Sequence, residues 1–320
     1  LESNANAAGA GALPPLTWHC LTGRGTGSGT GSSADSMVAP ASAVGALPAT
    51  PVDAPVEALM ASIEAALTSP VGLLLYVQDH ENVVVQEAQC WELIELVQRL
   101  VARGAAGRIV LVCPASRTCG ALVVGASKAV PLEIPELTVQ RVHVPSSIDM
   151  LRSGGPFGAI HAVVHSYLYW LASIAASHRS ETDLWVDPSP PHALRVPRLV
   201  PCRSLPPTAA PAVDPNGFYL ITGGTGGVGG ALIAWLLYEQ NVPSHNIMVI
   251  SRRDAQSPHA GVRCVKADFA SAAALGRCSE LCALRAVTGI FHLAGVLDDG
   301  LLVNMSRARL HMTVLPKAGV

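Results

Sequence analysis

The chain has 320 residues, of which 50% are hydrophobic and 14% are charged, and its formal net charge is −2. This length predicts about two domains. The hydrophobic fraction excludes a disordered chain over most of the length, and the near-neutral charge excludes a strongly basic surface for nucleic acid. We therefore expect a folded protein that does not bind nucleic acid.

Eight cysteines are too few for a disulfide framework, so a reducing, cytoplasmic location is expected, or a plastid if a transit peptide lies upstream. Cys278 and Cys282 are four residues apart, but no second pair of ligand residues accompanies them, and no metal site is predicted. The apolar stretch 159–176 contains two histidines and has helical periodicity. It predicts a core helix and no membrane span.

The first part of the chain changes character near residue 52. Residues 1–52 are mainly Ala, Gly, Ser, Thr and Pro, which predicts a flexible linker. Beyond it, apolar runs of strand length alternate with helical patterns, which predicts βαβ units and a parallel sheet. Strands are expected at 71–77, 109–113, 138–144, 183–186 and 194–200, and helices at 91–103, 119–130 and 159–176. Residues 79–82 supply turn and cap residues before the first helix.

A second α/β series follows residues 201–215, which contain five prolines and predict a domain boundary. The expected fold is α/β, with two tandem Rossmann-like, doubly wound parallel-sheet units, the second truncated. The predicted domains are a linker (1–52), a structural unit without cofactor (53–215) and the N-terminal part of a nucleotide-binding catalytic unit (216–320). In the last, strands are expected at 218–222, 246–250, 262–265 and 289–293, and helices at 227–239 and 271–287. The predicted strand order is 3-2-1-4, with the fourth strand as an exposed hydrophobic edge.

A glycine-rich turn lies between the first predicted strand and helix of this second unit. It matches G-x-G-x-x-G with Gly224, Thr225, Gly226, Gly227, Val228 and Gly229. Glycines permit a tight turn and let backbone N–H groups approach a pyrophosphate, which the helix N-terminus stabilises. The pattern predicts dinucleotide binding, and a purely structural turn is the alternative.

The ends of the next two strands bear on which dinucleotide binds. Ser251, Arg252 and Arg253 stand where an NAD-binding protein usually has an acidic residue. Two guanidinium groups suit a 2′-phosphate, which favours NADPH, although the arginines could also cap a solvated strand end. Asp268, followed by Phe269, is a candidate partner for the adenine, or an ordinary turn former.

The fourth strand ends in His292-Leu293-Ala294-Gly295. The small residues Ala294 and Gly295 would let the backbone pass close to a nicotinamide ribose. We expect His292 to be a packed or hydrogen-bonded residue and not a base.

Together these segments resemble the ketoreductase domain of a polyketide synthase, a branch of the short-chain dehydrogenase/reductases. The similar stretches are 219–229, 251–253, Asp268, 292–302 and 315–319. Residues 120–137 and 183–199 are similar to the structural subdomain that precedes such reductases. The resemblance thus covers all but the N-terminal linker.

The resemblance implies NADPH-dependent reduction of a β-ketoacyl thioester to the β-hydroxyacyl product. Its implied partners are an acyl carrier protein, with the substrate on phosphopantetheine, and the other domains of the same synthase. The family uses a Tyr, a Ser and a Lys, and Lys317 matches the Lys. Leu297, Asp298 and Asp299 match a signature that accompanies B-type stereochemistry, which implies a loop that steers the substrate, although Asp298-Asp299-Gly300 also suits a plain turn.

The sequence departs from the family pattern at the proton donor. None of its five tyrosines is followed by Lys or Asn four residues later. The family's Ser and Tyr are expected beyond Val320, so we expect the fragment to be inactive alone. The alternatives are a non-catalytic, reductase-like scaffold module of a megasynthase and the ketoreductase of a fatty acid synthase.

Overall fold

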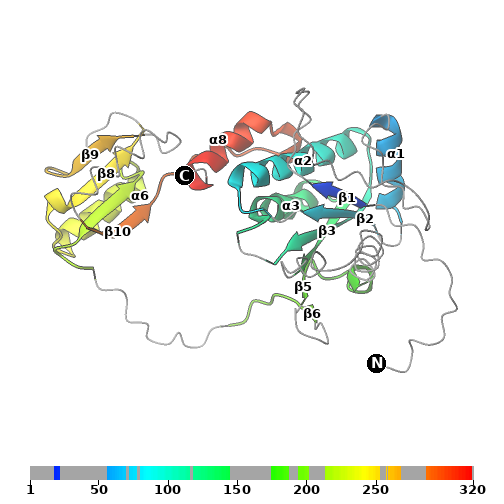
Figure 1. Cartoon of the computed structure of the whole chain (residues 1–320), viewed down its shortest axis with the longest axis horizontal. Coiled ribbons are helices and arrows are strands. Elements are labelled where there is room, and N and C mark those ends of the chain that lie inside the picture. Colours follow the sequence, from blue (N-terminus) through cyan, green and yellow to red (C-terminus); the bar gives the residue numbers. More distant parts are fainter. Residues whose placement is uncertain are drawn as a thin grey trace, which may run out of the picture. The chain divides into compact units, whose positions relative to one another are not determined.

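A computed structural model of the chain is shown in Figure 1. It divides into two compact units: unit 1 contains Leu1–Arg198 and Leu301–Asn304, and unit 2 contains Leu199–Gly300 and Met305–Val320. None of the described helices is both long and apolar enough to cross a membrane. The structure describes residues 18–21, 56–69, 72–77, 80–115, 118–144, 174–186, 194–201, 213–252, 257, 259–267 and 286–318.

Unit 1 is built on a six-stranded sheet in the order β1-β2-β3-β4-β5-β6. Neighbouring strands are parallel except for β5 and β6, which are antiparallel. The strands are β1 (Trp18–Leu21), β2 (Leu73–Val77), β3 (Gly107–Pro114), β4 (Leu137–Val144), β5 (Asp183–Val186) and β6 (Leu194–Arg195). The helices are α1 (Val56–Leu67), α2 (Val83–Ala102) and α3 (Ala121–Glu133).

Local sequence explains the helix–strand order of unit 1. The apolar runs of β2 and β3 are almost fully buried, as expected of parallel strands covered on both faces. Helix α2 begins where Asn82 caps it, because the Asn82 Oδ1 accepts a hydrogen bond from the Val84 N–H at 2.8 Å. Helices α2 and α3 lie side by side (Figure 1). The turn and cap residues expected before this helix are confirmed at Asn82.

Two expectations for unit 1 are wrong. Trp18–Leu21 forms β1, which pairs with β2, so these four residues are not linker. The strand expected at 194–200 ends at Arg195, and Pro197, which lacks a backbone N–H, cannot donate to a sheet ladder. Residues 159–173 of the expected helix at 159–176 lie outside the described part of the chain.

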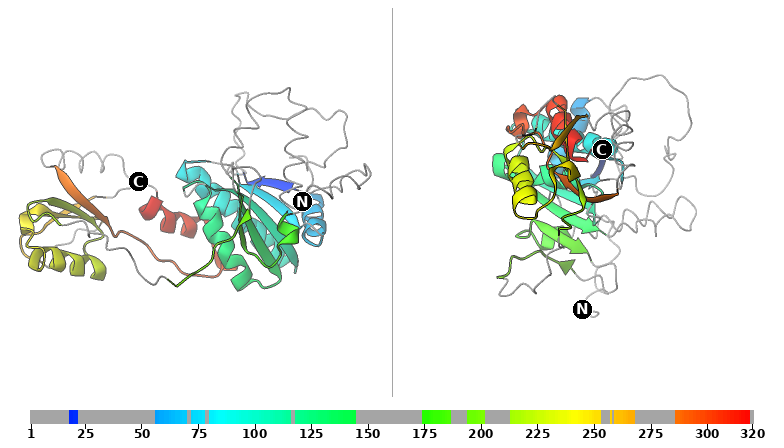
Figure 2. Two further views of the ribbon diagram at one scale, coloured as in Figure 1. Left: turned by 90° about the horizontal axis from the view of Figure 1, so that it is seen from below. Right: turned by 90° about the vertical axis from the view of Figure 1, so that its left-hand side faces the viewer.

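Unit 2 contains a four-stranded parallel sheet in the order β10-β7-β8-β9. This is the predicted order 3-2-1-4. Helix α6 lies on one face of the sheet (Figure 2), and its apolar side chains pack with buried residues of β7 and β8. The elements are β7 (Phe218–Thr222), α6 (Gly227–Tyr238), η1 (Ser244–Asn246), β8 (Ile247–Ser251), β9 (Arg263–Lys266), β10 (Val287–His292) and α8 (Arg307–Ala318).

This strand order places a topological switch in unit 2. The chain runs from β7 to β8 and β9 in one direction, and then returns to place β10 on the other side of β7. In open α/β sheets, ligands bind at the carboxyl ends of the strands at such a reversal. Strand β10 is an edge of the described sheet, and its Ile290 is 65% exposed, as expected of a hydrophobic edge.

A short 3₁₀ segment, η2 (Leu302–Asn304), belongs to unit 1 although it lies late in the sequence. The Leu302 side chain is 6% exposed. Its N–H donates to the Glu133 Oε2 at 2.6 Å, and its carbonyl accepts from the Gln98 Nε2 at 2.8 Å. Side chains of α2 and α3 thus hydrogen-bond to both backbone groups of Leu302, whose own side chain is buried. The functional roles expected for 53–215 and 216–320 remain predictions.

Candidate functional site

The turn between β7 and α6 requires glycine at three positions. Gly223 has a φ of +70°, and a Cβ there would lie 2.7 Å from the Leu293 carbonyl group. A Cβ on Gly224 would lie 2.8 Å from the Val249 Cγ1, and one on Gly229 would lie 2.5 Å from the Gly224 Cα. The turn therefore packs without space for side chains.

The start of α6 is open in the same turn. Gly226 is the N-cap residue and provides no side-chain cap, and a Cβ on Gly227 would meet nothing within 4 Å. The first N–H groups of a helix have no intrahelical partner and favour an anion. These features fit the pyrophosphate of a dinucleotide. Thr225 and Val228 of the predicted motif are exposed between the glycines.

The structure shows that Gly223, which the sequence analysis did not single out, forms the tight turn. In the three glycine roles of a dinucleotide turn, Gly223 would make the bend, Gly227 would leave room for the ligand and Gly229 would allow the helix to pack closely. The sequence signal was the glycine directly after β7, one position before the pattern that was matched.

The second strand ends at the same edge of the sheet. Ser251 is the last residue of β8, and its carbonyl accepts a hydrogen bond from the Ala267 N–H at 3.0 Å. Arg252 follows and is exposed. Lys266, which was also missed, pairs in register with Ser251 and adds a second cation at this edge. Arg253, Asp268 and Phe269 lie outside the described residues.

The segment that follows β10 is hydrogen-bonded to the end of β7. The N–H of Leu293 donates to the Thr222 carbonyl at 3.0 Å, and the N–H of Ala294 donates to the Thr222 Oγ1 at 3.2 Å. Gly295 follows, and a Cβ there would lie 3.7 Å from the Lys317 Cε, an ordinary contact. The small residues predicted at this position therefore lie directly after the switch, beside the glycine turn.

Lys317 lies in the last turn of α8 and reaches the same segment. Its Nζ donates to the Val296 carbonyl at 2.9 Å and to the Thr313 carbonyl at 3.2 Å. Two of the sequence-predicted features, the segment 294–296 and Lys317, are thus brought together.

The predicted substrate loop is held by an arginine that the sequence analysis missed. The Arg309 guanidinium donates two hydrogen bonds to the Asp298 carboxylate, at 2.9 and 2.6 Å, and one to the Asp299 carbonyl at 3.1 Å. The hydrogen bonds from Arg309 lower the pKa of Asp298, so this carboxylate is ionised at neutral pH. Leu297 is 84% exposed. The loop therefore presents an apolar side chain beside a neutralised carboxylate.

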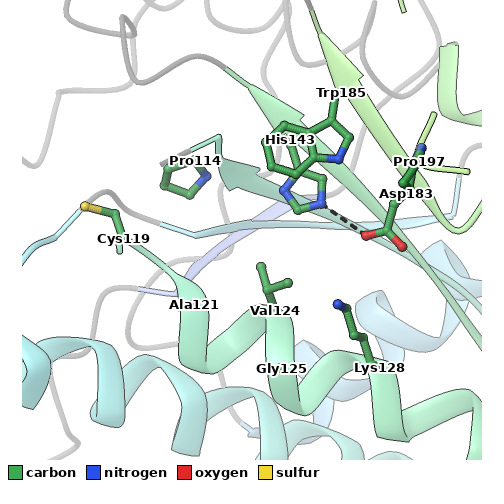
Figure 3. A pocket seen from close by; sticks show the side chains of 10 residues that line it. All are labelled: Pro114, Cys119, Ala121, Val124, Gly125, Lys128, His143, Asp183, Trp185 and Pro197. Carbon is green, nitrogen blue, oxygen red and sulfur yellow. Dashed lines mark hydrogen bonds and ion pairs between the residues drawn. The ribbon is translucent and has the colours of Figure 1, made fainter. Parts of the chain in front are cut away.

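A pocket of about 360 Å³ in unit 1 is lined by residues that include His143, Asp183 and Trp185 (Figure 3). His143 stacks on Trp185 with ring centroids 4.1 Å apart, and its Nε2 donates to the Asp183 carboxylate at 3.1 Å. The Cys113 Sγ lies 3.4 Å from the other ring nitrogen. Arg141 donates two hydrogen bonds to Asp183, at 2.7 and 2.8 Å.

This arrangement of Cys113, His143 and Asp183 does not supply a reactive thiol. Burial raises the pKa of Cys113 to about 12. Burial also lowers the pKa of His143, although the hydrogen bond to Asp183 opposes it. Burial disfavours ionised Asp183, but the hydrogen bonds from Arg141 and His143 outweigh it and hold its pKa well below the usual range. The cluster is a buried ion pair with a neutral imidazole and a protonated thiol, so the candidate site is the switch in unit 2.

Comparison with known proteins agrees with this location. A family model described as "KR domain" matches residues 217–319. Polyketide synthase GfsB of Streptomyces halstedii is 36% identical over 126 residues, covering 35% of this chain and 2% of the synthase. Erythronolide synthase EryA2 of Saccharopolyspora erythraea is 34% identical over 116 residues, covering 33% of this chain and 3% of the synthase.

Solved structures share the fold. A structure of A-type ketoreductases from a modular polyketide synthase has a TM-score of 0.55 at 21% identity, covering 76% of this chain and 53% of that one. An A1-type ketoreductase has a TM-score of 0.54 at 21% identity, covering 81% and 52%. The chain thus spans a few per cent of the curated synthases and about half of the solved chains. Residues 217–319 thus match the family model of KR domains, and the curated proteins that resemble this chain are polyketide synthases.

Proposed function

We propose that unit 2 binds NADPH and forms part of a ketoreductase that reduces a β-ketoacyl thioester on an acyl carrier protein to the β-hydroxyacyl product. One observation carries this proposal. The glycine turn lies at the topological switch with its helix N-terminus open at Gly227, and Lys317 reaches the segment that leaves β10 beside it. The open N-terminus of α6 and the Lys317 ammonium group therefore share one end of the sheet, which supports the proposal.

Each part of the site has a proposed role in holding the cofactor. The N–H groups at the start of α6 bind the pyrophosphate. Arg252 and Arg253, beside Ser251, bind the 2′-phosphate, which NADH lacks. The proposed role of Asp268 and Phe269 is to contact the adenine. NADPH supplies the hydride for the ketone carbon.

Lys317 has a proposed electrostatic role in catalysis. An ammonium group close to a hydroxyl favours the anion that remains after proton transfer. Because no tyrosine in this chain has Lys or Asn four residues later, we propose that residues outside this chain supply the proton donor. The chain alone is then expected to bind NADPH without turning over substrate.

The substrate loop has a proposed role in stereochemistry. Arg309 fixes the backbone and the carboxylate at Asp298 and Asp299, which leaves the exposed Leu297 to contact an incoming acyl chain. We propose that this loop guides the B-type course that the resemblance implies, with the acyl carrier protein and the other domains of the synthase as partners.

The test is a fluorescence titration of the 320-residue chain with NADPH and with NADH. A charge-assisted hydrogen bond contributes about 1.5–3 kcal/mol, so NADPH should bind about 10-fold to 150-fold more tightly. Arg252→Gln should reduce this preference. Arg263→Gln is the matched control, because Arg263 begins β9 at the opposite end of the sheet. Equal or tighter binding of NADH would refute NADPH as the cofactor.

The scaffold alternative predicts a different outcome of the same titration. A non-catalytic module needs no cofactor, so neither nucleotide would bind at concentrations that saturate related reductases. Binding of NADPH by the chain, followed by reduction of a β-ketoacyl thioester by the protein that contains it, supports the ketoreductase.

A further inference from the structure

Both ring nitrogens of His292 are engaged in hydrogen bonds. The Nε2 lies 2.9 Å from the Pro316 carbonyl oxygen, and the Nδ1 lies 2.8 Å from the Thr222 Oγ1. A carbonyl only accepts, so Nε2 carries a proton and donates. The Thr222 Oγ1 accepts from the Ala294 N–H and donates its own proton to Nδ1. One neutral tautomer satisfies every group in this chain of hydrogen bonds.

These hydrogen bonds join three segments that are distant in sequence. Thr222 is the last residue of β7, directly before the glycine turn, and is 3% exposed. His292 is the last residue of β10, and Pro316 lies in the last turn of α8. Pro316 directly precedes Lys317, whose Nζ returns to the Val296 carbonyl. Two hydrogen bonds, from His292 to Pro316 and from Lys317 to Val296, therefore hold the end of α8 against the end of β10 and the segment that follows it.

The last turn of α8 has backbone groups that need hydrogen-bond partners from outside the helix. Proline inside a helix removes one backbone hydrogen bond and strains the turn before it. The last carbonyls of a helix also have no intrahelical partner. The Pro316 carbonyl belongs to this last turn, and the imidazole N–H of His292 satisfies it. His292 therefore acts as a cap for the helix end that carries Lys317.

We propose that His292 and Thr222 are positioning residues that set the place of the Lys317 ammonium group relative to the glycine turn. The proposal rests on the proposed function for the role of Lys317, but the geometry that it describes is independent of turnover. His292 acts through Lys317 and transfers no proton to substrate, because both of its nitrogens are committed to Thr222 and Pro316.

The first test observes the lysine directly. The chain contains only three lysines, Lys128, Lys266 and Lys317, so ¹³C-methylated lysine signals can be assigned by single substitutions to arginine. Thr222→Val keeps the side-chain shape and removes the hydroxyl, and His292→Ala removes both hydrogen bonds. Each should shift the Lys317 signal and leave those of Lys128 and Lys266 unchanged. Lys266 lies in β9, so its unchanged signal shows that unit 2 remains folded.

Two variants serve as controls. Thr222→Ser keeps the hydroxyl and should restore the wild-type Lys317 signal. His311→Ala removes an exposed imidazole from the same helix, α8, and should leave all three signals unchanged. An unchanged Lys317 signal in both Thr222→Val and His292→Ala would overturn the proposal, whatever the enzyme does.

The second test measures catalysis in the ketoreductase that contains this chain. Misplacement of a catalytic group by about 1 Å costs up to about 100-fold in rate. Thr222→Val and His292→Ala should therefore lower kcat by about 10-fold to 100-fold while the KM for the thioester and the Kd for NADPH change little. Failure of the wild-type protein to bind NADPH would refute the proposed function. Normal NADPH binding with unchanged kcat in both variants would refute the positioning role alone.

Discussion

Three glycines of α6 offer a matched test of the phosphate turn. Alanine at Gly227 or Gly230 would meet nothing within 4 Å, whereas alanine at Gly229 would place its Cβ 2.5 Å from the Gly224 Cα. Alanine is favoured over glycine in a helix, so Gly227→Ala and Gly230→Ala should each raise the free energy of unfolding by about 0.5–1 kcal/mol. Gly229→Ala should lower it by about 1–3 kcal/mol through overpacking.

The Kd for NADPH should distinguish the two stabilising substitutions, Gly227→Ala and Gly230→Ala. In the proposed site the open space at Gly227 receives the pyrophosphate, so a methyl group there keeps the ligand from the helix N–H groups. Loss of one charge-assisted hydrogen bond costs about 1.5–3 kcal/mol, which raises the Kd for NADPH by about 10-fold to 150-fold. Gly230→Ala, one turn further along α6, should keep the wild-type Kd.

Two measurements on each variant suffice. Amide hydrogen exchange in α6 and β7 reports the stability of unit 2, and fluorescence titration reports the Kd for NADPH. If Gly227→Ala binds NADPH like the wild type, or if Gly230→Ala loses affinity equally, the ligand does not approach the start of α6 and the reasoning fails.

The remaining predictions concern unit 1 and use hydrogen exchange in its helices and strands. Leu302→Ala should destabilise α2 and α3 by about 2–4 kcal/mol, whereas Leu132→Ala, at a side chain that is 83% exposed, should change little; equal effects would contradict the burial of Leu302. The lowered pKa of Asp183 stabilises the folded state above the ordinary aspartate pKa, so β4 and β5 should lose protection as the pH falls below about 4. Asp183→Asn should flatten this dependence, and an unchanged acid response would show that another group controls it.

The strand-turn-helix at the switch could be predicted because its signals are local. The mainly apolar run at 218–222 predicts β7, and the glycines after it predict the turn. The strand order of unit 2 followed from general topology of doubly wound sheets. Lys317, in contrast, came only from the family resemblance, since a lysine near a helix end has no distinguishing pattern of its own.

The missed features depend on contacts between residues far apart in the chain. β1 is four residues long within a Gly- and Ser-rich stretch, and its pairing with β2 stabilises it. The role of Arg309 depends on its hydrogen bonds to Asp298, and the role of His292 depends on its hydrogen bond to Pro316. None of these pairs has a spacing that marks it in the sequence, because the loop between the partners adopts no regular period.

The return of Leu301–Asn304 to unit 1 has a practical consequence for building chimeras of this chain with related domains. The chain passes from unit 1 to unit 2, returns to unit 1 for four residues and then re-enters unit 2. Cutting the chain at one junction therefore does not yield two complete units. A donor segment grafted from residue 213 onward would bring its own Leu302 but meet a foreign pair of helices, with no Gln98 or Glu133 selected to receive it. Chimeras should therefore exchange both units together, or exchange α2 and α3 together with the segment Leu301–Asn304.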